Sequence, residues 1–164
     1  DGGFGRSVVY LTDHNEEGSV GFVLNKPLRV SVESVVAGLE GVDFPVYYGG
    51  PVGRDSLYYI HRRVDIPGAV MVGDGVFHGG DFDVVTRLAR EGRLGEGDIR
   101  FFAGYSGWSA GQLEGELRED SWLVGEVSRD EVFGGTEGLW ERIMRRLGAR
   151  PAIWSMFPED PRMN

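Results

Sequence analysis

The sequence has no cysteine, one lysine (Lys26) and no apolar run long enough to form a membrane-spanning helix. The lack of cysteine excludes a disulfide scaffold, thiolate catalysis and cysteine-ligated zinc or iron–sulfur sites. The lack of a long apolar run excludes a helical membrane span. No targeting pattern is present either, so we expect a cytoplasmic protein.

Positive charge is scarce. The chain has 17 Lys and Arg against 26 Asp and Glu, which gives a net charge of −9. A field of this sign repels phosphate backbones and anionic lipid headgroups. We therefore expect no membrane partner, and direct nucleic-acid binding is disfavoured.

Glycine, in contrast, is abundant, with 27 among 164 residues, whereas about 7% is typical. Such an excess indicates tight turns and close backbone contacts rather than long helices. Hydrophobic residues make up 41% of the chain and are spread along it. This composition predicts one globular domain over residues 1–164.

Apolar and β-branched runs between turn residues predict seven strands. They lie at 6–12, 18–24, 45–48, 56–61, 69–72, 98–103 and 121–125. We expect the first two to form a hairpin at the centre of the sheet. Pro27 is expected to end the second strand, because proline cannot donate to a ladder.

Helices are predicted where capping residues precede amphipathic stretches. Ser31 begins a short helical segment, Asp81 begins a helix that stops at Gly92, and Thr136 begins a last helix that ends at Gly148. The strands come in runs interrupted by helices, which is typical of an α+β domain. A short apolar stretch, 152–157, follows the last helix.

One candidate site follows the strand at 98–103. The run Gly104-Tyr105-Ser106-Gly107-Trp108 is expected to lead into a helix near Ser109, with Gln112 at its capping-box position. Backbone N–H groups of a helix N-terminus beside glycines would suit an anion. In the alternative interpretation the glycines only shape a turn, while Tyr105 and Trp108 fill space.

Two other strand exits have similar chemistry. Gly49-Gly50-Pro51 resembles a backbone nest, and Asn25 with Lys26 places an amide and a cation at a strand end. We hypothesise that these exits and the run from Gly104 to Gln112 line one pocket, which binds a small anionic ligand or a protein partner. The alternative is that each is a solvated turn.

Catalytic patterns are incomplete. Ser106 could act as the nucleophile of a hydrolase if His14 or His61 lay within hydrogen-bond reach, but neither a G-x-S-x-G elbow nor a P-loop is present. The three histidines lack metal-site spacing, so no metal or cofactor is expected. A non-enzymatic binding or regulatory protein is favoured, with the hydrolase and a DNA-binding protein as alternatives. Trp108, Trp122 and Trp140 are expected to be mostly buried.

Several motifs stand in an order that resembles the YqgE/AlgH family of bacteria. They are Arg6-Ser7-Val8-Val9-Tyr10, Asn25-Lys26-Pro27, Gly49-Gly50-Pro51, and Gly104 to Glu116 followed by Trp122. The resemblance implies a mixed, barrel-like β-sheet partly surrounded by helices, in agreement with the α+β class. The family has no agreed activity and carries a transcriptional-regulator label from its AlgH branch.

The sequence departs from the family pattern at two places. Ser19 stands where alanine is common, and members usually have an apolar strand ahead of the position of Asp1. Without that strand we expect an open sheet edge near residues 6–12 or elsewhere, or an edge covered by another chain.

Overall fold

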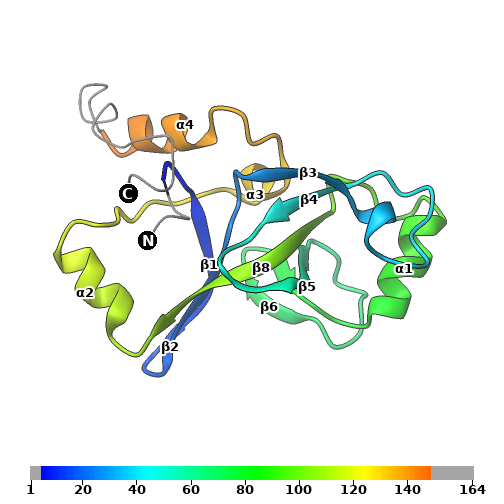
Figure 1. The fold of residues 1–164 in the computed structure, drawn as a ribbon, viewed down its shortest axis with the longest axis horizontal. Coiled ribbons are helices and arrows are strands. Elements are labelled where there is room, and N and C mark those ends of the chain that lie inside the picture. Colours follow the sequence, from blue (N-terminus) through cyan, green and yellow to red (C-terminus); the bar gives the residue numbers. More distant parts are fainter. Residues whose placement is uncertain (1–4, 149–164) are drawn as a thin grey trace.

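The computed structural model describes residues 5–148, which form a nearly closed, barrel-like sheet with four helices around it (Figure 1). The α+β class and the mixed, barrel-like sheet are confirmed. The strands are β1 (Val9–Asn15), β2 (Gly18–Val23), β3 (Pro27–Ser31), β4 (Pro45–Tyr48), β5 (Val52–His61), β6 (Val70–Gly73), β7 (Val76–His78) and β8 (Ile99–Ser109). The helices are α1 (Phe82–Arg90), α2 (Gln112–Arg118), α3 (Arg129–Phe133) and α4 (Leu139–Arg146).

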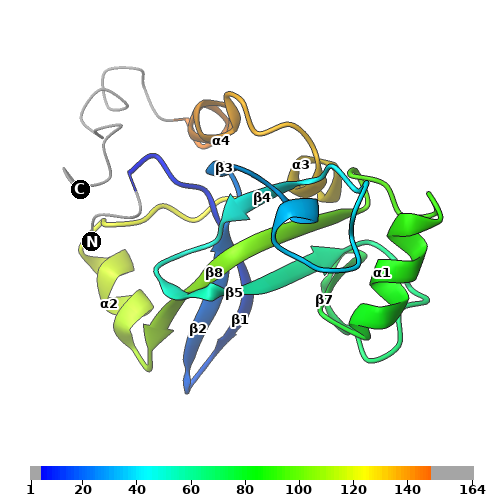
Figure 2. The same ribbon diagram turned by 45° about the vertical axis from the view of Figure 1, so that its right-hand side comes forward.

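Strand β8 is the centre of the sheet. It pairs antiparallel with β2 and β5 and parallel with β4, and the main strand order is β1-β2-β8-β5-β7-β6. Figure 2 shows β8 crossing the middle of the sheet, with α1 at one end and α2 at the other. The predicted β1–β2 hairpin forms, but its predicted central place is wrong, because β1 is an edge strand.

The alternation of side chains along β8 divides the core in two. Phe101 packs into a cluster with Val85 and Leu88 of α1, while the next residue, Phe102, packs into a second cluster with Leu139 of α4. Successive strand residues point to opposite faces, so adjacent phenylalanines serve opposite sides. Each face of the sheet is therefore closed by its own helices.

Local capping signals set several helix ends. The Asp81 side chain accepts a hydrogen bond from the N–H of Asp83 at 3.0 Å, as expected for the start of α1. Gly148 follows α4 with a φ of +82°, the left-handed conformation expected there. The predicted cap at Thr136 is wrong, because α4 begins after Gly138.

Other sequence predictions are wrong for physical reasons. Pro27 begins β3 rather than simply ending a strand, because an edge strand tolerates proline at its first residue. The helical segment after Ser31 is a single 3₁₀ turn over Val32–Ser34. The strand predicted at 121–125 is wrong, because these residues pair with no described strand despite their strand propensity. Residues 152–157 lie outside the described part of the chain.

No helix within residues 5–148 combines the length and the apolar character that crossing a bilayer requires.

Candidate functional site

The two glycine motifs meet as a backbone crossing. Gly49 donates its N–H to the carbonyl of Ala103 at 2.9 Å, and a Cβ on Gly50 would overlap the backbone of Tyr105. Gly104 has a φ of +76°, and a Cβ there would lie 2.5 Å from the Gly50 carbonyl oxygen. Only residues without a Cβ allow this approach. The structure thus brings these segments together, and packing accounts for their glycines.

The predicted strand-to-helix junction differs from expectation. Strand β8 continues through Gly104, Gly107 and Trp108 to Ser109, and α2 begins three residues later at Gln112. The helix N-terminus therefore lies beyond the glycines rather than beside them.

Ser106 is fully buried at this crossing, and its hydroxyl donates to the carbonyl of Gly49 at 3.0 Å. His14 Nδ1 instead contacts Ser19 Oγ at 2.6 Å, and His61 Nε2 contacts the Gly79 carbonyl at 2.9 Å. Within residues 5–148, Ser106 is therefore hydrogen-bonded to no histidine. The hydrolase alternative requires such a bond.

Asn25 and Lys26 hold the start of the described chain. Asn25 accepts a hydrogen bond from the N–H of Val8 and donates to the Arg6 carbonyl, both at 2.9 Å. Lys26 Nζ donates to the Gly5 carbonyl at 2.7 Å. These contacts give both side chains a structural role at the sheet edge.

The backbone of Lys26 does lie next to the glycine crossing. Its carbonyl accepts a hydrogen bond from the N–H of Tyr48, which immediately precedes Gly49. The segment of Asn25 and Lys26 therefore lies beside the end of β4, and the glycines that follow β4 contact the segment that begins at Gly104. Pro51 is exposed on the turn before β5. Whether these residues bind a ligand stays a prediction.

A groove of about 520 Å³ lies elsewhere, between the start of β1, residues 120–127, α2 and α4. Of the predicted site residues it includes only Trp108. We call it the tryptophan groove; its main apolar lining is Tyr10, Trp108, Leu117, Trp122, Trp140 and Leu147, and its charged residues are Arg6, Asp74, Asp120 and Glu126. Its walls come from distant parts of the sequence, around residues 6–11, 108–127 and 140–147, so no local pattern could reveal it.

Glu116 positions two walls of the tryptophan groove. Its Oε1 accepts hydrogen bonds from the indole N–H of Trp108 at 3.1 Å and of Trp122 at 2.8 Å. The two rings meet edge to face, with centroids 5.8 Å apart. Trp108 and Trp140 are buried as predicted, whereas Trp122 is partly exposed.

Gln112 completes this network. Its Nε2 donates to Glu116 Oε2 at 3.0 Å, while its Oε1 accepts the N–H of Ser109 at 3.0 Å, the bond expected from the capping-box position. Burial acts to raise the pKa of Glu116, but the bonds from Trp122, Gln112 and Trp108 outweigh it and hold the pKa below its ordinary value. Glu116 is therefore a charged carboxylate whose hydrogen bonds hold the indole rings of Trp108 and Trp122 in place.

The neighbouring carboxylate faces elsewhere. Glu114 Oε2 lies 3.7 Å from His14 Nε2 at the hairpin end, so Glu114 and Glu116 form no carboxylate pair. This agrees with residues two apart on a helix facing different directions. Ser19, which contacts His14, is 3% exposed and thus poorly accessible to a substrate.

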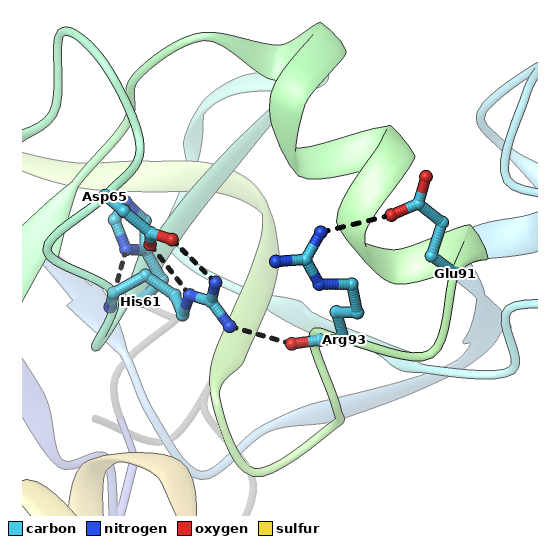
Figure 3. Close-up of polar contacts among 5 residues, drawn as sticks. His61, Asp65, Glu91 and Arg93 are labelled. Carbon is cyan, nitrogen blue, oxygen red and sulfur yellow. Dashed lines mark hydrogen bonds and ion pairs between the residues drawn. The ribbon is translucent and has the colours of Figure 1, made fainter.

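A second polar cluster lies around Asp65, near the end of β5 (Figure 3). Arg63 makes two parallel hydrogen bonds to Asp65, at 2.8 and 2.7 Å, and lowers the pKa of that carboxyl to about 2. Arg63 also donates to the Arg93 carbonyl, and its N–H donates to His61 Nδ1. Burial lowers the pKa of His61, which is fully enclosed. This cluster connects the segment that follows β5 to the segment that follows α1 through hydrogen bonds of Arg63.

No group of three or more potential metal-ligating side chains occurs within residues 5–148.

Comparisons with known proteins agree with the fold. A family model described as AlgH-like matches residues 1–152. A UPF0301 protein of Bacteroides thetaiotaomicron is 40% identical over all of this chain and 85% of its own length. A UPF0301 protein of Chlorobium phaeobacteroides is 44% identical over 98% of this chain and 87% of its own.

Solved structures give the same result. The solution structure of the AlgH protein from Pseudomonas aeruginosa has a TM-score of 0.72 and 28% identity, over 91% of this chain and 82% of that one. A crystal structure from Corynebacterium diphtheriae, 23% identical with a TM-score of 0.70, covers 94% of this chain and 82% of that one and shares the fold. This chain belongs to the bacterial AlgH-like family.

Proposed function

We propose that this protein is a non-enzymatic binding protein whose tryptophan groove holds an apolar ligand or an apolar segment of a protein partner. The observation that carries the proposal is the pair Trp108 and Trp122, which Glu116 orients along a groove of about 520 Å³. Ligand sites are commonly concave and apolar, with a few polar groups that fix orientation.

The charges of the groove refine the ligand class. Among the described residues that line it, Asp74, Asp120 and Glu126 are acidic and Arg6 is basic, and the whole chain carries −9. These charges favour a neutral or basic ligand, unlike the anion expected at the glycine motifs. They also oppose direct DNA binding, so a regulatory role would act through a bound protein or small molecule. A cytoplasmic location is part of the proposal.

The test uses the neutral, solvatochromic dye Nile red and two matched variants. Val124 lines the groove and is 74% exposed, while Val64 is 86% exposed and lies outside it. Either can be replaced by Asp with little effect on the core. We expect Val124→Asp to weaken dye binding at least fivefold and Val64→Asp to leave it unchanged. Equal effects of the two, or no dye binding by the parent, would refute the proposal.

A further inference from the structure

We propose that His61 is an acid-sensitive latch, which releases the segment of residues 62–69 from the end of β5 when its ring is protonated. The opening is local, so the sheet and the tryptophan groove stay folded. The latch is separate from the proposed function, because neither His61 nor any residue of the 62–69 segment lines the groove. The hydrogen bonds of the ring, its burial and the few contacts of the segment support the inference.

Both ring nitrogens of His61 are bound to backbone groups. Nδ1 accepts the N–H of Arg63 at 3.2 Å, so the single proton of the neutral ring lies on Nε2 (Figure 3). Nε2 in turn donates to the carbonyl of Gly79 at 2.9 Å. The ring therefore joins the segment that follows β5 to the segment that precedes α1, and only its neutral form makes both bonds.

A second proton on the ring of His61 disrupts this arrangement. It would be added at Nδ1, where the new N–H points at the N–H of Arg63, and the backbone of Arg63 has to move away. His61 is 0% exposed, so water cannot solvate the positive charge while the segment is closed. Opening of the 62–69 segment removes both penalties, because it frees Nδ1 and admits water.

The surroundings of His61 oppose its protonation in the closed form. Burial has the largest effect and lowers the pKa of the ring. The bond to Gly79 and the charge of Asp65 act to raise this pKa, whereas His78 on β7 and Arg63 add to the lowering. The pKa of His61 lies below the ordinary 6.5 as a result.

The carboxylates on the other neighbouring elements act on other groups. Burial and then Asp81, before α1, raise the pKa of Tyr59, and Asp98, before β8, contributes to raising the pKa of Arg63. The pKa of His61 is thus lower in the closed form than in an open form, where water surrounds the ring. The closed form is fully favoured above pH 6.5, and this preference is lost as the pH falls below 6.5.

Few contacts other than the latch hold the 62–69 segment. Within this segment, all of which the structure describes, Ile66 is the one buried side chain. The further hydrogen bonds to the rest of the protein are Arg62 N–H to the Asp98 carbonyl, Asp81 N–H to the Pro67 carbonyl, Arg63 to the Arg93 carbonyl and Arg62 to Asp130. Segments with so little buried apolar surface open at a lower free energy than the core.

Amide hydrogen exchange of the full chain, corrected for the intrinsic rate at each pH, measures the opening. The reporters are the N–H groups of Arg63 and Asp81, which are bonded only while the segment is closed. We expect their protection to fall at least fivefold between about pH 7.5 and about pH 5.5, because one proton linked to opening changes the equilibrium by up to about tenfold per pH unit. Unchanged protection would overturn the inference.

Urea separates opening of the segment from unfolding of the whole protein. Concentrations below the unfolding transition lower protection in proportion to the surface that an opening exposes. At about pH 5.5 the two reporters should therefore respond little, whereas the N–H of Gly49, at the centre of the sheet, should respond if it exchanges by unfolding. Reporters that respond as strongly as Gly49 would show that acid unfolds the whole protein, and the inference would be wrong.

A matched pair of variants identifies the residue that takes up the proton. His61→Gln removes the titrating ring, and His78→Gln removes the neighbouring histidine on β7. We expect the pH dependence of protection to disappear in His61→Gln and to persist in His78→Gln. The reverse pattern, or loss in both variants, contradicts the latch.

If circular dichroism shows that His61→Gln does not fold, NMR of the ring nitrogens in the parent decides instead. We expect His61 to carry its proton on Nε2 at neutral pH and to remain mostly neutral at pH 6.5. A proton on Nδ1, or a ring that is half protonated at pH 6.5 or above, would refute the inference. Neither result bears on dye binding in the groove, so the proposed function is tested separately.

Discussion

Replacement of Glu116 by Ala is predicted to destabilise the fold and to disorder the tryptophan groove together. The change removes the acceptor of two indole N–H groups and of Gln112 Nε2. A hydrogen bond to a charged group contributes about 1.5–3 kcal/mol. Trp108 is 7% exposed, so water reaches its N–H poorly, whereas water can reach the partly exposed Trp122. Loss of the whole bond to Trp108 and part of the bond to Trp122 should lower the free energy of unfolding by about 2–4 kcal/mol.

The matched control is Glu114→Ala, two residues away on the same helix. Its carboxylate is 43% exposed and 3.7 Å from His14, so its removal should change stability by less than about 0.5 kcal/mol. Urea unfolding followed by circular dichroism measures both free energies, and Nile red titration reports on the groove. If the two variants lose the same stability, or if Glu116→Ala keeps full dye binding, the role assigned to Glu116 is wrong.

Three further predictions concern stability. Arg146 holds the pKa of Glu131 at about 2 against an ordinary 4.5, so the stability that this pair contributes above pH 4.5 should be lost as pH falls toward 2. Because Arg146 is 47% exposed, we expect the free energy of unfolding to fall by about 1–2 kcal/mol. Unfolding measured across that pH range should show this loss in the parent but not in Glu131→Gln. Gly104→Ala forces a side chain to a φ of +76° and into two carbonyl oxygens, at 2.5 and 2.9 Å, and should cost more than about 2 kcal/mol in urea unfolding, while Gly97→Ala, in open space, costs less than 1. Trp140→Ala should cost about 3–5 kcal/mol, because the ring is 8% exposed, and an unchanged thermal midpoint would contradict this.

The elements that the sequence predicts correctly are those with local causes. Asp81 begins α1 because its side chain binds an N–H two residues ahead, and β1 pairs with β2 across a short turn. The hydrophobic alternation within each strand needs no distant information. Turn and cap chemistry alone therefore predicts the hairpin and the start of α1.

The errors arise where a distant segment decides the local structure. Residues 121–125 have strand propensity, but a strand needs a partner, and the described chain offers them none. The ligand site predicted at the glycines of 49–50 and 104 stays a prediction, because a backbone that contacts another backbone needs the same residues as one that contacts an anion. Of the predicted site residues only Trp108 lines the groove, since its walls come from segments far apart in the chain.

The central position of β8 also orders events during synthesis. The β1–β2 hairpin and the pairing of β5, β7 and β6 are local, but in the described ladder these two parts are joined only through residues 99–109. The first two thirds of the chain must therefore leave the ribosome before the sheet can close. Until then both inner edges expose backbone and apolar side chains, the condition under which nascent chains aggregate or need chaperones. Slowing translation before residues 99–109 have left the ribosome should thus lengthen the period of vulnerability, whereas slowing it after they have emerged should not.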